Sequence, residues 1–134
     1  MAPLRVLLVD DSAPVRTVLD ELLRRNVPSA VIITASSGQE ALNVLQTVTV
    51  DVVLSDVSMP NGDGFFLLEA VQTQWPSLPV VLMSGEPMEE RAIQAGAKAF
   101  FAKPLDPQRL IETLTSLASR TIRVVIRHDP DQPS

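Results

Sequence analysis

The sequence contains no cysteine, and this absence excludes several kinds of chemistry. Without cysteine the chain can form no disulfide, bind no metal through thiolates and use no thiol as a nucleophile. Tyrosine is absent as well, and lysine occurs only at Lys98 and Lys103. No apolar run is long enough to cross a membrane, and the N-terminus lacks the layout of a signal peptide. We therefore expect a cytoplasmic protein without a membrane-bound segment.

Basic residues are in the minority, since the formal net charge of the 134-residue chain is -5. Proteins that bind nucleic acid neutralise phosphates with lysine and arginine, so we expect no direct nucleic-acid binding. Hydrophobic residues make up 46% and charged residues 20% of the chain, which is typical of a folded globular protein. The length suits one domain, which we place at residues 1–120, with a C-terminal tail at 121–134.

Five short apolar runs, rich in valine, isoleucine, leucine or phenylalanine, recur along the chain. They are nearly continuous rather than alternating, which is typical of strands buried on both faces of a sheet. The runs are LRVLLV (4–9), AVIIT (30–34), DVVLSD (51–56), PVVLMS (79–84) and AFFAK (99–103). In the tail, TIRVVIR (121–127) could form an extra strand used in a dimer contact, and residues 128–134 are expected to be disordered.

Each run is followed by a segment whose apolar residues have the spacing of one helix face. Ser12 suits the cap of the first segment, and Asp106 with Pro107 suits the start of the last. The residues predicted to face the core are Val15, Val18, Leu19, Leu22 and Leu23 in the first segment, Ala41, Leu42 and Leu45 in the second, Phe66, Leu67 and Val71 in the third, and Leu110, Leu114, Leu117 and Ala118 in the last. This alternation predicts an α/β fold with a doubly wound, five-stranded parallel sheet between two layers of helices.

Polar and charged residues stand where the predicted strands end. The first strand ends in Asp10 and Asp11, the third in Asp56, the fourth in Ser84 and the fifth in Lys103. In an open parallel sheet, binding sites form outside the carboxyl ends of the strands. We therefore expect these five residues to converge at one edge of the sheet.

Three carboxylates at one edge repel one another, and a divalent cation would relieve that repulsion. Oxygen-only ligands with room for water suit Mg²⁺ better than zinc. The same arrangement would attract a phosphoryl group, whose oxygens need cations and hydroxyl donors. Taken singly, each residue has a simpler interpretation: Asp11 as a helix cap, Ser84 as an ordinary strand end, and Lys103 before Pro104 as a solvated turn.

Four segments together match a known family over roughly residues 4–119. They are VLLVDDS, DVVLSDVSMPNGDGF, VVLMSGE and AGAKAFFAKPL. The spacing from the aspartate to MPxxDG and from the aromatic residue to Lys-Pro is the most specific part. The chain resembles the receiver domains of two-component response regulators, of the single-domain chemotaxis type. The resemblance implies a (βα)5, flavodoxin-like three-layer sandwich.

The resemblance also assigns a metal site and a nucleophile. Asp56 would be the phosphoacceptor. Asp11, Asp56 and the backbone carbonyl of Ser58 would ligate Mg²⁺ directly, and Asp10 would act through a bound water. Phosphoryl transfer requires mainly positioning and charge neutralisation, which this set would supply.

Three further residues are assigned by the same resemblance. Lys103 would pair with the acceptor carboxylate and then with a phosphoryl oxygen, and Ser84 would hydrogen-bond the new phosphoryl group. Phe100 matches the aromatic position that moves inward when the hydroxyl residue shifts, although plain core packing explains an aromatic residue there equally well. Because Phe100 lacks a hydroxyl, any switching at this position would be steric. The interval from Ser84 to Gly96 is about one helical turn shorter than is usual in the family.

The resemblance implies a Mg²⁺-dependent switch that takes its phosphoryl group from a histidine kinase or a histidine phosphotransfer protein. Such a domain catalyses its own phosphorylation and dephosphorylation without being a conventional enzyme. Its output would be binding to a downstream protein, as a monomer or weak dimer. Onward phosphotransfer, or a role as the receiver fragment of a longer regulator, is the alternative.

Other functions fit the sequence less well. An aspartyl-phosphate hydrolase would need a second aspartate where Ser58 stands. A flavin-binding module would need a phosphate-binding loop after the first strand, but Asp10 and Asp11 would repel a phosphate there. A degenerate receiver that only binds partners is disfavoured because every site residue is of an acceptable type.

Overall fold

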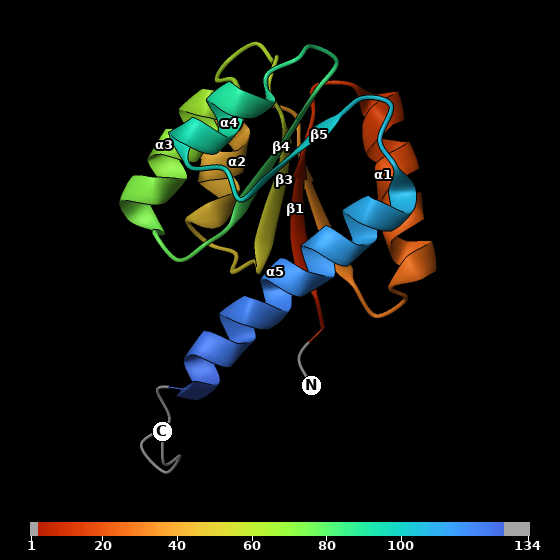
Figure 1. Cartoon of the computed structure of the whole chain (residues 1–134), viewed down its shortest axis with the longest axis vertical. Coiled ribbons are helices and arrows are strands. Elements are labelled where there is room, and N and C mark those ends of the chain that lie inside the picture. Colours follow the sequence, from red (N-terminus) through yellow and green to blue (C-terminus); the bar gives the residue numbers. More distant parts are fainter. Residues whose placement is uncertain (1–2, 128–134) are drawn as a thin grey trace.

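The computed structural model describes residues 3–127 of the chain, which form five strands and five helices in strict alternation (Figure 1). The strands are β1 (Arg5–Val9), β2 (Val31–Ala35), β3 (Val52–Asp56), β4 (Val80–Ser84) and β5 (Ala99–Ala102). The helices are α1 (Ala13–Asn26), α2 (Gly38–Leu45), α3 (Gly64–Gln74), α4 (Glu89–Ala95) and α5 (Pro107–Arg127). The five predicted strands are thereby confirmed.

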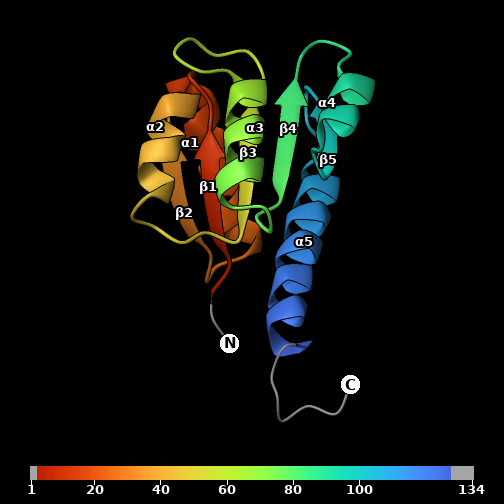
Figure 2. The same cartoon turned by 90° about the vertical axis from the view of Figure 1, so that its left-hand side faces the viewer.

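All five strands are parallel and form one sheet in the order β2-β1-β3-β4-β5. Helices cover both of its faces, and Figure 2 looks onto the face that carries α2 and α3. The predicted fold class, a doubly wound parallel sheet of the flavodoxin-like type, is confirmed. Among the described residues, no helix combines the length and apolarity needed to cross a membrane.

The core is divided between the two faces of the sheet, as the continuous apolar strands require. On one face, α1 and α5 pack Leu19, Leu23, Leu110 and Leu114 against the sheet. On the other, residues of α2, α3 and α4 pack against the alternate residues of the same strands. Burial on both faces leaves only the ends of the strands open for a polar site.

The helix starts follow the predicted capping chemistry. The Ser12 hydroxyl accepts the Val15 N–H at 3.3 Å, and Asp106 Oδ1 accepts the Gln108 N–H at 3.1 Å. By contrast, α4 has no side-chain cap at Met88 and contains only seven residues. It ends at Gly96, whose φ of 109° is left-handed and suits glycine.

Two residues predicted to face the core point outward instead. Val18 of α1 is 63% exposed and Phe66 of α3 is 43% exposed. Each lies at the margin of an apolar stripe whose centre is occupied by fully buried neighbours, such as Leu23 in α1 and Leu67 in α3. The helical period therefore predicted the buried face of each helix correctly, but it made the buried stripe too wide.

The extra strand predicted at residues 121–127 is wrong, because α5 continues through Arg127. Its last turns extend past the end of the sheet (Figures 1 and 2). The β-branched residues of TIRVVIR favour a strand locally, but extending an existing helix requires no new nucleus. The disorder predicted for residues 128–134 concerns a segment outside the described residues.

Candidate functional site

The site lies at the point where the strand order reverses. The chain runs from β1 outward to β2 and then returns to β3 on the other side of β1. The connections from the adjacent β1 and β3 ends therefore leave in opposite directions and open a crevice between them. Asp10 and Asp11 directly follow β1, and Asp56 is the last residue of β3. The topology thus brings the first and third predicted strand ends to one crevice.

The three carboxylates meet there. One oxygen atom from each of Asp10, Asp11 and Asp56 lies within 4.8 Å of the other two. Asp10 is 1% exposed and Asp56 is 7% exposed, while Asp11 is open to solvent. A cluster of oxygen ligands with one solvent-facing member fits a hard cation that keeps some of its water, as Mg²⁺ does. The donor set therefore fits the metal that the sequence implies.

Lys103 places its ammonium group against this cluster. Its Nζ atom lies 3.0 Å from Asp56 Oδ1 and 3.4 Å from Asp10 Oδ2. The residue directly follows β5, and its backbone N–H donates to the Ser84 carbonyl at 2.9 Å. The two strand ends that carry Ser84 and Lys103 are therefore tied to each other as well as to the acidic crevice.

The electrostatics of the crevice act on both partners of the ion pair. Burial raises the pKa of Asp56 and the nearby Asp10 and Asp11 raise it further, which outweighs the opposing effect of Lys103. Burial lowers the pKa of Lys103, but its contacts with Asp56 and Asp10 outweigh that effect, so this pKa is raised. The Asp56 carboxylate is thus destabilised as an anion, and a cation bound beside it would relieve that cost.

The remaining predicted residues lie on β4, on β5 and in the loop after β3. Ser84, 3% exposed, ends β4, and its hydroxyl accepts the Glu86 N–H at 3.0 Å. Phe100 of β5 is half-buried and packs against the core on the side of α2, α3 and α4. Ser58 lies in the exposed loop after β3, and within the described part of the chain its carbonyl accepts no hydrogen bond.

Sequence reasoning missed Arg16, which holds the β1–α1 connection in place. Its Nη1 atom donates to the Asp10 carbonyl at 2.7 Å, and the Ser12 N–H donates to Asp10 Oδ1 at 2.9 Å. Asp10 is therefore fixed through both its backbone and its carboxylate. The sequence did contain a signal for Arg16, because a cation in the first turn of a helix is unfavourable next to the helix dipole and therefore indicates a specific partner.

The loop after Asp56 is pinned by close backbone contacts that the sequence did not reveal. The Gly38 N–H donates to the Gly62 carbonyl at 2.8 Å, and the Gln39 N–H donates to the Asn61 carbonyl at 3.2 Å. The loop is thus attached to the first residues of α2. A Cβ atom on Gly64 would lie 2.6 Å from the Asp56 carbonyl oxygen, so helix α3 begins directly against the end of β3.

Comparison with known proteins identifies the family. Residues 6–115 match the family described as the response regulator receiver domain. The chain belongs to this family. The receiver domain predicted from the sequence is therefore confirmed.

Solved structures agree with this assignment. CheY4, a chemotaxis protein of Vibrio cholerae, is 32% identical, with a TM-score of 0.78 over 87% of this chain and 99% of that chain. A Francisella response regulator receiver domain is 27% identical, with a TM-score of 0.81 over 87% of this chain and 98% of that one.

Longer relatives carry the receiver domain as one part. A protein-glutamate methylesterase/protein-glutamine glutaminase of Symbiobacterium thermophilum is 41% identical over 107 residues, which are 76% of this chain and 29% of that protein. The DNA-binding transcriptional regulator NtrC of Klebsiella pneumoniae is 36% identical over 118 residues, or 86% of this chain and 24% of that protein. The chain therefore spans less than a third of either relative.

Proposed function

We propose that this receiver domain accepts a phosphoryl group on Asp56 in a Mg²⁺-dependent reaction and uses it as a switch. The observation that carries the proposal is the position of Asp56. It is a nearly buried carboxylate at the end of a central strand, 3.0 Å from the Lys103 ammonium and beside two further aspartates. A structural ion pair would not require the two additional acids.

In the proposed reaction, a carboxylate oxygen of Asp56 attacks the phosphorus of a phosphohistidine on the donor protein. The new O–P bond forms as the N–P bond to the imidazole breaks, and the departing imidazole takes up a proton. Lys103, already in contact with Asp56, neutralises charge on the incoming oxygens, and Ser84 donates its hydroxyl to one of them.

The metal would be held by Asp11, Asp56 and the Ser58 carbonyl, with Asp10 acting through water. When bound, Mg²⁺ supplies positive charge to the phosphoryl oxygens and offsets the repulsion among the carboxylates. The exposure of Asp11 and the unpaired Ser58 carbonyl within the described residues support these two assignments.

The switch would begin at the tie between β4 and β5. Phosphorylation adds charge and strong acceptors at Asp56, so Ser84 and Lys103 are drawn toward it. Because the Ser84 carbonyl accepts the Lys103 N–H, the ends of β4 and β5 would move together. Phe100, half-buried beside this tie, would follow into the vacated space.

The donor in this proposal is a histidine kinase or a histidine phosphotransfer protein in the cytoplasm, and the output is altered binding to a downstream protein. Methylesterase activity and DNA binding belong to the named relatives. The proposal gives this chain neither, and an onward phosphotransfer role remains the alternative. In this proposal the protein is a monomer or weak dimer, and it makes no direct contact with nucleic acid or a membrane.

The test is the intact mass of the protein after incubation with Mg²⁺ and a small acyl-phosphate donor. We expect the wild type to gain one phosphoryl group and Asp56→Asn to gain none. Asp51→Asn is the matched control, because Asp51 lies at the opposite end of β3, where its Oδ2 accepts the Arg5 N–H. A gain that persists in Asp56→Asn, or that survives removal of Mg²⁺ by chelator, would contradict the proposal.

A further inference from the structure

The loop after the acceptor strand contains an Asn-Gly pair with unusual backbone geometry. Asn61 is exposed and has a φ of 58°, and Gly62 has a φ of 98°. The sequence contains two other asparagines, Asn26 and Asn43, and each is followed by a valine. A glycine after asparagine leaves the next backbone nitrogen unhindered, whereas a β-branched valine shields it.

We propose that Asn61 is a modification site at which the side-chain amide is lost by spontaneous deamidation. The Gly62 backbone nitrogen attacks Cγ of Asn61 and gives up its proton as ammonia leaves, which forms a five-membered succinimide. Water then opens either carbonyl of the ring and gives aspartate or isoaspartate. The net reaction consumes one water and releases one ammonia, and it requires no oxidant, reductant or enzyme.

The fold leaves both reacting groups available. Within the described residues, the Asn61 side chain and the Gly62 N–H form no hydrogen bond. The bonds that pin this loop to α2 run through the carbonyls of Asn61 and Gly62 instead. The other asparagines are held: Asn26 donates its side-chain amide to the Leu22 carbonyl at 2.8 Å, and both lie within helices.

Isoaspartate would change the loop more than aspartate does. It reroutes the backbone through the side chain, so the chain at residue 61 gains one methylene. The original Asn61 carbonyl, which accepts the Gln39 N–H, becomes part of a free carboxylate and is no longer bonded to the Gly62 nitrogen. More chain atoms then separate it from the Gly62 carbonyl, which accepts the Gly38 N–H. Both hydrogen bonds cannot keep their geometry with a longer link between them. The same loop carries Ser58, so the modification would loosen the proposed metal site; this consequence, unlike the deamidation itself, rests on the proposed function.

The modification is tested by ageing the folded protein at mildly alkaline pH and mapping its peptides by mass spectrometry. Deamidation increases the mass of a peptide by the difference between O and NH. We expect this increase in the peptide with Asn61 at least about tenfold faster than in the peptides with Asn26 or Asn43. A tenfold ratio corresponds to about 1.4 kcal/mol in activation free energy. A parallel sample in urea measures the unfolded chain. If Asn61 converts in urea but stays intact in the folded protein, the fold protects it and the proposal is wrong.

The consequence is tested on the isoaspartate form, separated chromatographically from the intact protein. We expect it to accept a phosphoryl group from the small acyl-phosphate donor at least about tenfold more slowly than the intact protein. The variant Asn61→Asp has the added charge with normal backbone length, and we expect its rate to remain close to that of the wild type. Equal rates for the isoaspartate and intact forms would overturn the consequence. Failure of the intact protein itself to accept a phosphoryl group would count against the proposed function, and peptide mapping would still decide the deamidation.

Discussion

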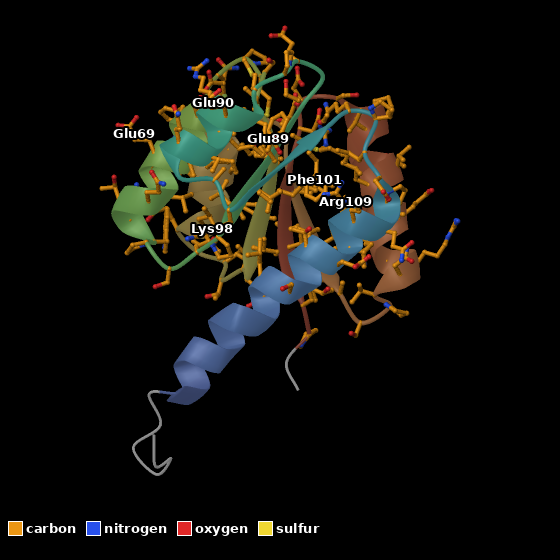
Figure 3. All side chains as sticks on the ribbon, viewed as in Figure 1. Glu69, Glu89, Glu90, Lys98, Phe101 and Arg109 are labelled. Carbon is orange, nitrogen blue, oxygen red and sulfur yellow. The ribbon has the colours of Figure 1, made fainter. Side chains whose placement is uncertain are left out.

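Lys103 and Lys98 are the two lysines of the sequence, and they make a matched pair at the residue scale. Lys103 contacts Asp56 and Asp10, whereas Lys98 is exposed just before β5, at the opposite end of that strand (Figure 3). Replacing either lysine by methionine removes the same charge. A difference between the two variants therefore reflects the position of Lys103.

We expect Lys103→Met to slow phosphoryl acceptance by roughly 100-fold, the usual effect of removing a preorganised group that stabilises developing charge. Lys98→Met should leave the rate unchanged. The measurement is the rate of mass gain with the acyl-phosphate donor at saturating Mg²⁺. Equal rates for the two variants would mean that Lys103 has no part in the transfer.

Gly64 is a second residue whose role is local and testable. A Cβ atom there would lie 2.6 Å from the Asp56 carbonyl and 2.9 Å from the Val57 Cα, and neither backbone atom can move freely. At Gly85, by contrast, an added Cβ would meet nothing within 4 Å. The two glycines therefore separate the effect of close packing from that of a glycine substitution in general.

We expect Gly64→Ala to lower the free energy of unfolding by about 2 kcal/mol, the range found for overpacked sites. Gly85→Ala should change it by less than about 0.5 kcal/mol. Urea denaturation at neutral pH measures both. A Gly64→Ala variant as stable as the wild type would show that α3 can move away from β3 at little cost.

At the scale of elements, α4 is the shortest of the described helices. It has seven residues, no side-chain N-cap, and only Ala92 buried. Two side chains of α3 hold it: the ring of Phe65 lies 4.1 Å below the Arg91 guanidinium, and Gln72 Nε2 donates to the Ala95 carbonyl at 3.0 Å. Its outward acidic residues include Glu89 and Glu90 (Figure 3).

We expect the amides of α4 to exchange with solvent faster than those of α3, and Gln72→Ala to accelerate them roughly fivefold, the effect of losing about 1 kcal/mol of local stability. Gln74→Ala is the control, since Gln74 accepts a hydrogen bond from Gln46, the residue that follows α2. Hydrogen exchange followed by mass spectrometry resolves the two helices. Equal acceleration of α4 by both variants would exclude a specific role for Gln72.

The elements also show what the sequence could reveal. Strand ends such as Asp56 and Lys103 were predictable because parallel strands must end at one edge, whatever the connections between them. The outward position of Val18 and Phe66 was not predictable, since the helical period does not fix the width of the buried stripe. Residues 121–127 have a local preference for β structure, but they continue α5 because the preceding helix needs no new nucleus to extend.

Hydrogen bonds that fix the connections between the elements were not predictable from the sequence. The bond from Arg16 to the Asp10 carbonyl lies at a strand–helix junction, and the bond between Gly38 and Gly62 joins the start of α2 to the loop after β3. Neither follows from apolar periodicity, which describes only what is buried. The candidate acids were therefore predictable from the sequence, but the contacts that position them were not.

At the scale of the whole molecule, the acidic crevice should cost stability when no cation is bound. The pKa of Asp56 is raised above its ordinary value of 3.8, chiefly by burial. The folded state therefore holds the proton more tightly than the unfolded chain does, and ionisation of Asp56 opposes folding. This cost is present above the raised pKa and disappears as the pH falls through it toward 3.8.

We accordingly expect Asp56→Asn to be more stable than the wild type in chelator at neutral pH, by on the order of 1 kcal/mol. The advantage should shrink as the pH is lowered. Urea denaturation of both proteins across this pH range measures the difference. A variant that is less stable at neutral pH would show that the ion pair with Lys103 outweighs burial.

At saturating Mg²⁺ we expect the wild type to be more stable than Asp56→Asn. A cation that binds only the folded protein stabilises it by about 2.7 kcal/mol at a concentration 100 times the Kd. We expect this gain in the wild type and a much smaller one in Asp56→Asn, which lacks a charged ligand. Thermal unfolding with and without Mg²⁺ provides the comparison, and an equal gain in both proteins would place the metal elsewhere.

The most direct test of the central claim is to locate the phosphoryl group within the chain. After incubation with Mg²⁺ and the acyl-phosphate donor, borohydride reduces an acyl phosphate to an alcohol, and peptide mass spectrometry identifies the residue that was modified. We expect reduction at Asp56 alone, and none in protein treated with chelator. Reduction at Asp10 or Asp11, or a phosphoryl group that resists borohydride, would contradict it.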